Sequence, residues 1–322
     1  MASGSILLQN RQLTLLELGR RTDPKGDLAV IAEVLSESNE FLMDAIWKEA
    51  NGAFYNKTVK RVSLPKGTFR KINEGVDSEA SQTTEVIDGI AMLESYAEAD
   101  KALVDMAANP TQARNDEAKA FIEGLGQTFA DTFVYGNANY EPEKFTGLAP
   151  RIASLGTMCV SAGNAGGTSA YIVEWGENAC HLVYPKGHKS VGVERNDLGQ
   201  VTAVDSTGKK HEVYRDHFKV APGFVCKDDR ALGRVANIAV TGSSNLLTAA
   251  LLVKVINQLR SKGRNAVIYV NRTVKAQLDI LAMDKSNVWY TEKDAFGNPV
   301  TMFRGVPVRM LDSILDNEST VS

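Results

Sequence analysis

The chain has 322 residues, of which 43% are hydrophobic and 23% charged, the balance of a packed globular protein with a sizeable core. Its 36 lysines and arginines stand against 39 aspartates and glutamates, and the net charge of −3 excludes the basic excess of a protein that grips nucleic acid tightly. No apolar run reaches the roughly 20 residues of a transmembrane helix, and three cysteines (Cys159, Cys180 and Cys226) argue for reduced thiols in a cytoplasm and against a disulfide framework.

The first segment carries two helical patterns separated by a break. Residues 11–20 are predicted to form a short amphipathic helix, after which Pro24 and Gly26 interrupt the chain. Residues 27–48 repeat apolar side chains at three- and four-residue spacing, which predicts a second helix. The residues that set this spacing are Leu28, Ile31, Val34, Leu35, Leu42, Ile46 and Trp47. Such helices have too little apolar surface for a core, so we expect them to pack on something else.

Residues 54–76 are predicted to form an extended ribbon. Val59 and Val62 fall on opposite faces of a strand, so the ribbon has no single apolar face to bury on its own domain. Residues 51–73 carry basic side chains and no acid, whereas residues 74–100 carry eight acids and neither Lys nor Arg. The basic residues are Lys57, Lys60, Arg61, Lys66, Arg70 and Lys71. This ribbon is expected to lean on another surface, because a two-stranded ribbon alone is marginal in water.

Two helices are predicted next. Residues 83–106 have a helix-like spacing of apolar side chains. Residues from Pro110 to about Gly136 give the clearest helical pattern of the chain, with Asn109 as N-cap. Gly124 and Gly126 weaken this helix and suggest that another backbone packs closely there. The face expected to be buried is formed by Phe121, Leu125, Phe129 and Phe133.

The second half of the chain mixes short strands with helices. Residues 151–236 alternate β-rich runs with turn clusters and predict an antiparallel sheet. Residues 243–264 are predicted to be a helix with Ser or Asn as its cap, residues 266–270 a buried strand, and residues 271–283 a helix capped by Asn271. The final pattern is a hairpin whose second strand should point inward at Val306, Val308 and Met310.

No motif for catalysis or metal binding has the spacing that its chemistry requires. His211 and His217 are six residues apart in a β-rich run, whereas the zinc motif needs two histidines at i and i+4 on a helix. Cys180, His181 and His188 lack the second cysteine pair of a structural zinc site. We therefore predict no enzymatic activity, no catalytic or metal-binding residue and no cofactor.

Four segments are informative when they are taken together in their order along the chain: "SLPKGTFRKINEGV", "LESYAEADKALVD", "FVYGNANYEPEKFTGLAPR" and "FRGVPVRMLDSIL". In this order they resemble the major capsid proteins of tailed double-stranded DNA phages, with short-tailed phages of the epsilon 15 type as the closest likeness. The resemblance implies an α+β chain with the Hong Kong 97-type capsid fold. It implies an N-terminal arm (1–47), an extended E-loop (48–82), a P domain with a long spine helix (83–150), an A domain (151–300) and a C-terminal return to the P domain (301–322).

The resemblance also implies function and partners. Copies of the chain would form hexamers and pentamers of an icosahedral shell around packaged double-stranded DNA, without sequence-specific binding and without a membrane. A portal protein, a separate scaffolding protein and a decoration or cement protein are the other expected partners. The shell would assemble in the bacterial cytoplasm and remain in the virion. Two alternatives stay open, the shell protein of an encapsulin-like bacterial nanocompartment and a soluble α/β enzyme.

The resemblance gives the basic ribbon a use. We expect the E-loop to reach over a neighbouring subunit, with Lys60, Arg61, Lys66, Arg70 and Lys71 near acids of that subunit. The expected acceptors are Asp116, Glu117 and Glu123 of the spine helix, or the segment 74–100. The spine helix itself should be buried against the P-domain sheet and the returning C-terminal hairpin. The inner surface of the shell, formed by the arm and the underside of the spine helix, should not be basic.

Overall fold

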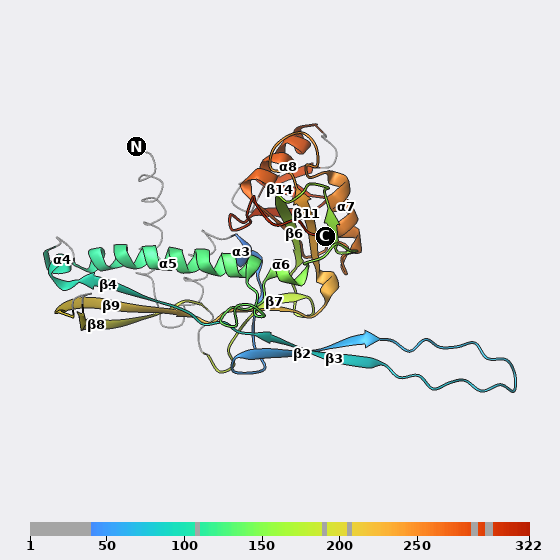
Figure 1. Ribbon diagram of the computed structural model, residues 1–322, viewed down its shortest axis with the longest axis horizontal. Helices are drawn as coiled ribbons and strands as arrows, with labels where there is room; N and C mark the ends of the chain where they lie inside the picture. The colour runs from blue at the N-terminus through green and yellow to red at the C-terminus, as the bar shows by residue number, and fades with distance from the viewer. Residues whose placement is uncertain (1–39, 107–109, 189–191, 205–207, 285–288, 294–298) are drawn as a thin grey trace.

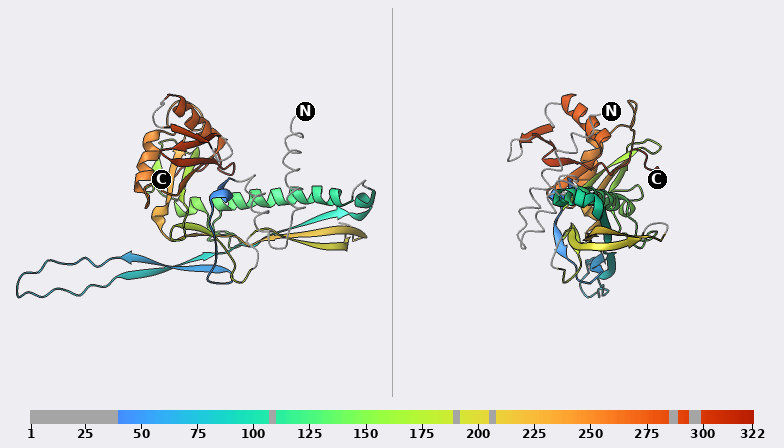
Figure 2. Two further views of the ribbon diagram at one scale, coloured as in Figure 1. Left: turned by 180° about the vertical axis from the view of Figure 1, so that it is seen from behind. Right: turned by 90° about the vertical axis from the view of Figure 1, so that its left-hand side faces the viewer.

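The computed structural model describes residues 40–106, 110–188, 192–204, 208–284, 289–293 and 299–322. Figure 1 shows a body of sheets and helices, with a long helix and a sheet extending on one side and a two-stranded ribbon on the other. The views in Figure 2 give the same arrangement from behind and from the end. The helix predicted for residues 11–20, the part of the predicted helix 27–48 before residue 40, and the cap at Asn109 lie outside the described residues.

The start of the described chain is a short helix followed by a strand. Helix α3 (Phe41–Asp44) is followed by Ala45, whose backbone is already extended, with φ −70° and ψ 131°. Strand β1 (Trp47–Glu49) then pairs in parallel with β7 (Cys180–Tyr184), and β10 (Gly223–Cys226) completes this three-stranded sheet. The helix predicted for residues 27–48 is therefore wrong beyond α3, because backbone pairing with β7 overrides the helical spacing of the side chains.

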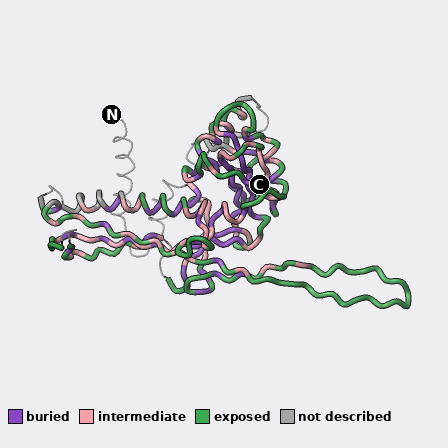
Figure 3. Tube along the Cα trace, viewed as in Figure 1, coloured by how far each residue is buried: buried purple, intermediate pink, exposed green. Residues whose placement is uncertain are grey.

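The ribbon consists of two antiparallel strands and a long connection. Strand β2 (Tyr55–Ser63) pairs with β3 (Gln82–Gly89), and residues 64–81 between them contain neither helix nor strand. Figure 3 colours the outer part of the ribbon as exposed. The prediction of an extended, breaker-interrupted ribbon at residues 54–76 is confirmed.

The helix predicted for residues 83–106 is wrong over most of its length. Strand β3 is followed by strand β4 (Leu93–Asp100), and only α4 (Lys101–Met106) is helical. In β4 the more buried residues alternate with exposed ones, which is the period of a half-buried strand. The three- and four-residue spacing of Val86, Ile87 and Ile90 indicated a helix. These residues are β-branched, which favours strands, and the pairing of β3 with β2 overrides the helical spacing.

The long helix α5 (Pro110–Tyr135) lies along a three-stranded sheet of β4, β9 (Lys210–Val220) and β8 (Glu194–Val204) (Figure 1). The predicted helix and its buried face are confirmed. Three of the four expected residues are fully buried and Phe121 is partly buried, and the buried ones are Leu125, Phe129 and Phe133. The predicted domain limits remain a prediction. Strands β8 and β9 fall within residues 151–300, the range expected for the A domain, but they form one sheet with β4 beside α5.

The surroundings of α5 differ in two respects from the prediction. Its buried face meets β4, β9 and the ring of Phe41, which stacks on Phe133 at 4.4 Å between ring centroids. The hairpin was expected to reach α5, but the contact comes from the segment after it, residues 311–322, which we call the tail. There the backbone NH of Leu315 donates to the Tyr135 hydroxyl at 2.9 Å. At Gly124 no atom of the chain lies within 4 Å of where a Cβ would stand, so the expected close backbone is not found there.

A seven-stranded sheet forms the body. Helices α7 (Ala249–Gln258) and α8 (Arg272–Asp284) pack on one face of it, and the apolar cluster that contains Phe133 covers the other. The strands predicted within residues 151–236 are confirmed, although they are shared among three sheets. The strand order in this sheet is β13 (Trp289–Lys293), β14 (Pro299–Phe303), β15 (Val306–Met310), β12 (Ala266–Val270), β6 (Thr168–Glu174), β11 (Leu232–Ile238) and β5 (Cys159–Ser161).

The details of the C-terminal half follow the sequence with two exceptions. The cap of α8 is Asn271 as predicted, since its Oδ1 accepts from the Val274 NH at 2.9 Å. The cap of α7 is Thr248 and not Ser or Asn. The final hairpin is confirmed and Val306 and Val308 are buried, but Met310 is 38% exposed because it ends the strand. None of the described helices is both long enough and apolar enough to cross a membrane.

Candidate assembly surface

The root of the ribbon is fixed to the body by polar contacts. Asn56, Thr58 and Asp88 are buried on one face of β2–β3. The Arg151 guanidinium, at the end of helix α6 (Leu148–Arg151), donates to Asp88 Oδ1 at 2.7 Å and to the Phe224 carbonyl at 3.0 Å. A charge-assisted bond between groups that are both mostly buried holds geometry better than an exposed pair does. The ribbon therefore leaves the body in a defined direction.

The outer part of the ribbon presents apolar side chains to solvent. Phe69 and Ile72, in the connection between the strands, are almost completely exposed. Large apolar groups clustered in one exposed segment mark an interaction surface more often than scattered ones do. We call this set the apolar ribbon residues: Val59, Val62, Leu64, Phe69, Ile72, Val76 and Ile87.

The predicted basic residues of the ribbon fall into two groups. Lys60 forms an ion pair with Asp229 of its own chain, in the short 3-10 helix η1 (Asp229–Ala231), at 2.6 Å. The neighbouring Asp228 is not available to Lys60 in the same way, because it accepts a hydrogen bond from Arg230, which lowers the pKa of the Asp228 carboxyl. In the described part of the chain no carboxylate forms an ion pair with the remaining members of the set. These are Arg61, Lys66, Arg70 and Lys71, whereas Lys57, the other basic residue of the ribbon, pairs with Glu85.

The predicted acidic partners are not brought to the ribbon within one chain. Glu123 lies on α5 and accepts from Gln127 Nε2 at 3.4 Å, and the side chains of Asp116 and Glu117 lie outside what the structure describes. Helix α5 and the ribbon leave the body on opposite sides in Figures 1 and 2. A contact between these two groups would therefore need a second subunit.

Part of the acidic stretch 74–100 is already occupied by the chain itself. Glu85 on β3 lies 2.8 Å from Lys57 Nζ on β2. On β4, Glu98 pairs with Arg215 of β9 at 2.6 Å, and Glu94 contacts His217 and Lys219 of that strand. Sequence reasoning missed these pairs because a helix was expected where β4 pairs with β9. The acids that remain for a neighbour are fewer than the sequence suggested.

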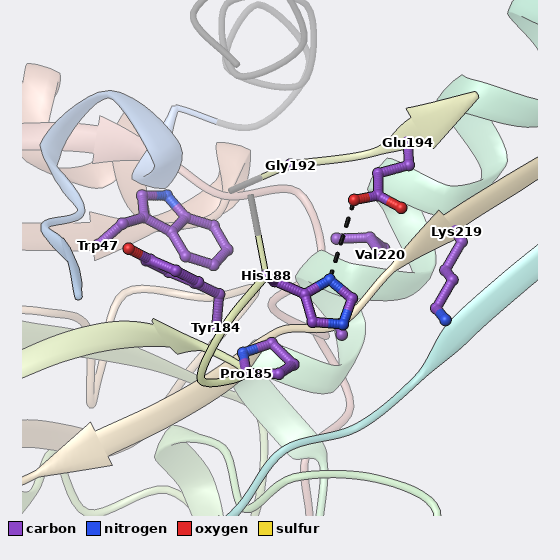
Figure 4. Close-up of a pocket in the computed structure, with 9 residues that line it drawn as sticks. Trp47, Tyr184, Pro185, His188, Gly192, Glu194, Lys219 and Val220 are labelled. Atoms are coloured by element: carbon purple, nitrogen blue, oxygen red, sulfur yellow. Dashed lines mark ion pairs between the residues drawn. The ribbon is translucent and has the colours of Figure 1, made fainter. Parts of the chain in front are cut away.

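A hollow beside β7 and β9 offers little catalytic chemistry. Figure 4 shows the His188 ring directed toward Glu194, with 3.8 Å between Nδ1 and Oε1. A serine or cysteine hydrolase needs a nucleophile next to such a base, and no described lining residue is Ser, Thr or Cys. The lining residues are Trp47, Tyr184, Pro185, His188, Gly192, Glu194, Lys219, Val220 and Ala221. Among the residues that the structure describes, no three His, Cys, Asp or Glu side chains gather as metal ligands.

The histidines and cysteines singled out in the sequence lie apart from this hollow, with the exception of His188. Cys180 and His181 are buried in β7, and His211 and His217 lie on β9. Burial, with Lys227 and Lys48 nearby, lowers the pKa of His181 to about 4. A neutral buried histidine of this kind fills space in the body.

Comparison with known proteins places the chain among phage proteins. A chain in the structure of bacteriophage Epsilon15 is 28% identical, with 95% of this chain and 96% of that chain covered and a TM-score of 0.65. The capsid of bacteriophage JBD30 is 12% identical over 84% of this chain and 88% of that chain, with a TM-score of 0.47. The SrpI encapsulin of Synechococcus elongatus is 11% identical over 65% and 89%, with a TM-score of 0.42. No curated protein matches.

The likeness to the Epsilon15 chain confirms the predicted Hong Kong 97-type fold and the predicted resemblance. A sequence profile of the family described as Major capsid protein GP7 matches residues 23–322, nearly the whole chain. The chain therefore belongs to the Major capsid protein GP7 family.

Proposed function

We propose that copies of this major capsid protein form the hexamers and pentamers of an icosahedral phage head, and that the ribbon of each copy docks on a neighbouring subunit. The observation that carries the proposal is the ribbon itself, which is fixed at its root by Arg151 and Asp88 and exposes apolar side chains beyond it. A monomer gains nothing from holding such a surface in water.

The apolar ribbon residues supply most of the docking free energy in this proposal. Burying one large apolar side chain stabilises a contact by about 1.5–3 kcal/mol, whereas an exposed ion pair contributes about 0.2–1 kcal/mol. The unpaired cations then act on encounter and register more than on affinity. Arg61, Lys66, Arg70 and Lys71 would face acids of the neighbour, with Asp116, Glu117 and Glu123 as the candidates. Lys60 is the weakest member of the set because Asp229 already pairs with it.

The remaining parts of the proposal concern the particle. The shell encloses double-stranded DNA without gripping it, in agreement with the net charge of −3. The N-terminal arm and the underside of α5 form an inner surface that is not basic. The shell assembles in the host cytoplasm with a separate scaffolding protein, joins a portal protein and can take a decoration protein. We infer a structural role without catalysis.

One experiment tests the function. The purified protein is examined by sedimentation and electron microscopy, beside a variant in which residues 64–81 are replaced by a short Gly-Ser turn. We expect closed particles from the wild type and soluble, folded capsomers or monomers from the variant. Closed particles from the variant would exclude docking through the ribbon. Particles purified from cells that hold protein cargo and no DNA would point to a nanocompartment shell.

A further inference from the structure

Two cysteines face each other across the sheet of β1, β7 and β10. Cys180 of β7 and Cys226 of β10 are direct partners in the antiparallel register. The neighbouring pair is hydrogen-bonded, since the Lys227 NH donates to the Ala179 carbonyl at 3.0 Å. Because hydrogen-bonded and non-hydrogen-bonded pairs alternate along an antiparallel ladder, Cys180 and Cys226 occupy a non-hydrogen-bonded position. In agreement, the Cys180 carbonyl turns away from β10 and accepts from the Gly176 NH at 2.9 Å.

This position has the spacing that a disulfide requires. The Cα atoms of a non-hydrogen-bonded antiparallel pair are about 4.5 Å apart, within the roughly 4.4–6.8 Å found across disulfides. Both side chains project to the same face, into the cluster that also contains Leu182 and Phe224. Val183, which follows Leu182, and Val225, which follows Phe224, project to the opposite face. The register position of the two cysteines therefore meets the Cα spacing of a disulfide.

The surroundings make the two thiols unequal. The adjacent Cys180 side chain lowers the pKa of the Cys226 thiol, and Arg151 and Lys60 nearby act in the same direction. The Cys226 thiol itself donates to the Asp228 carbonyl at 3.1 Å. Burial raises the pKa of the Cys180 thiol. Cys226 is therefore the better nucleophile. Both residues are buried, so an oxidant reaches them only when β10, a four-residue strand at the edge of its sheet, opens locally.

We propose that Cys180 and Cys226 form a redox pair that closes to a disulfide when the protein meets a low-molecular-weight disulfide such as oxidised glutathione. The Cys226 thiolate attacks one sulfur of the oxidant, forms a mixed disulfide and releases one thiolate, which takes up a proton. Cys180 then loses its proton, attacks the Cys226 sulfur and expels the second thiol. The two protein thiols are oxidised and one oxidant disulfide is reduced to two thiols.

The new bond would close a loop that contains the whole of β8 and β9. It would tie the edge strand β10 to β7, next to the Arg151 that anchors the ribbon. Opening of this sheet edge would then require breaking a covalent bond. The proposal concerns the chain alone and does not depend on the ribbon or on assembly.

The test uses the wild-type chain, purified reduced and then treated with oxidised glutathione at mildly alkaline pH. We expect a mass loss of about 2 Da, one alkylatable thiol left after denaturation, and a cross-linked peptide pair that holds Cys180 and Cys226. The melting temperature should rise by about 3–8 °C and fall back after reduction. The matched control Cys159→Ser, also at a buried position, should show the same mass loss and no remaining free thiol.

The variants Cys180→Ser and Cys226→Ser should lose the cross-link, and Cys180→Ser should stop at a glutathione adduct on Cys226. If a serine variant fails to fold, the presence or absence of the Cys180–Cys226 peptide in the wild-type digest still tests the proposal. Where the native chain does not react, the treatment is repeated in denaturant below the unfolding transition, and three free thiols under that condition would overturn the proposal. So would a glutathione adduct that never resolves, or a cross-link that includes Cys159.

Discussion

The Arg234 guanidinium donates to the Glu318 carboxylate at 3.0 Å, and the two side chains are only 5% and 6% exposed. Glu318 also accepts from the hydroxyls of Tyr135, at 2.6 Å, and Tyr171, at 3.0 Å. One carboxylate in the tail thus joins β11, β6 and the end of α5. The tail is part of the core of the body, although its sequence is polar.

Glu318→Gln should destabilise the subunit by about 3–5 kcal/mol, because it leaves the charge of Arg234 buried without a counter-charge. Urea unfolding of the unassembled subunit measures the cost. The matched control is Asp312→Asn, which breaks the pair with Arg272 where the side chains are 57% and 78% exposed. That change should cost less than about 1 kcal/mol. Equal costs for the two variants would show that burial of the Glu318 pair does not matter.

Phe129→Ala should cost about 3–5 kcal/mol as a truncation in the core. The Phe129 ring lies edge-on to Phe41 and Phe145, at 5.5 and 5.9 Å between centroids. We expect insoluble or unfolded protein, scored by solubility and thermal melting, with Tyr140→Ala as an exposed aromatic control that changes neither. A soluble, fully folded Phe129→Ala subunit would mean that this face of α5 is an assembly surface.

Phe69→Ser combined with Ile72→Ser should leave the melting temperature of the subunit unchanged, because both side chains are almost fully exposed in the free chain. Assembly should weaken by at least tenfold in the protein concentration it requires, since about 1.5–3 kcal/mol is lost for each side chain no longer buried. Sedimentation across a concentration series measures this, and Tyr140→Ser is the matched control. An unchanged assembly threshold would remove these two residues from the contact.

Arg61→Glu combined with Arg70→Glu should leave the subunit folded and weaken assembly, because neither arginine pairs with a described carboxylate of its own chain. Assembly of the wild type should also weaken as salt rises, since exposed charges are screened over about 8–10 Å. Arg264→Glu with Arg304→Glu makes the same charge change on the body. If the ribbon variant forms shells as readily as wild type at low salt, the charges do not contribute and the apolar ribbon residues carry the contact alone.

Acidification should destabilise the subunit between pH 6.5 and about 4. Burial lowers the pKa of His181 to about 4, so its stabilising contribution is present above the ordinary pKa of 6.5 and is lost as pH falls toward the folded value. The full effect is on the order of 3 kcal/mol. Urea midpoints at pH 7 and pH 4.5 measure it, and His181→Leu should reduce the difference. His211→Gln, which retains His181, should keep the wild-type difference.

The sequence predicts those parts of the fold in which a pattern is too long to suit more than one structure. A four-residue spacing such as that from Phe121 to Phe133 keeps one face of a strand as well as of a helix, but the pattern from Pro110 to Gly136 is too long for a strand, and α5 matches the helix. Val86, Ile87 and Ile90 have a helical spacing, yet Val86 and Ile87 lie in β3, because the pairing of β2 with β3 is not visible in a local pattern. Glu318 gave no signal, because an acid in a C-terminal segment that also carries Asp312 and Asp316 looks the same whether it is buried or solvated.

The sequence predicted the ribbon that carries the candidate contact, whereas the contact itself stays a prediction. A basic segment without an apolar face marked the ribbon, since such a segment cannot bury a whole apolar face on its own domain, and only polar residues at its root, such as Asn56 and Thr58, are buried there. The partner of Lys60 was not predictable, because Asp229 lies 169 residues away. The apolar content of the ribbon was underrated because Ile72 and Val76 stand among turn residues, and Ile87 was placed in a helix.

The anchoring of the ribbon has a mechanical consequence. Asp88 is held by Arg151, and Arg151 also holds the Phe224 carbonyl. Phe224 in turn lies edge-on to Phe133 near the end of α5, at 5.3 Å between ring centroids. A sideways displacement of the ribbon tip is therefore passed on to the long helix, through the Arg151 guanidinium and the rings of Phe224 and Phe133. Movement of the ribbon and movement of α5 are mechanically coupled through Arg151.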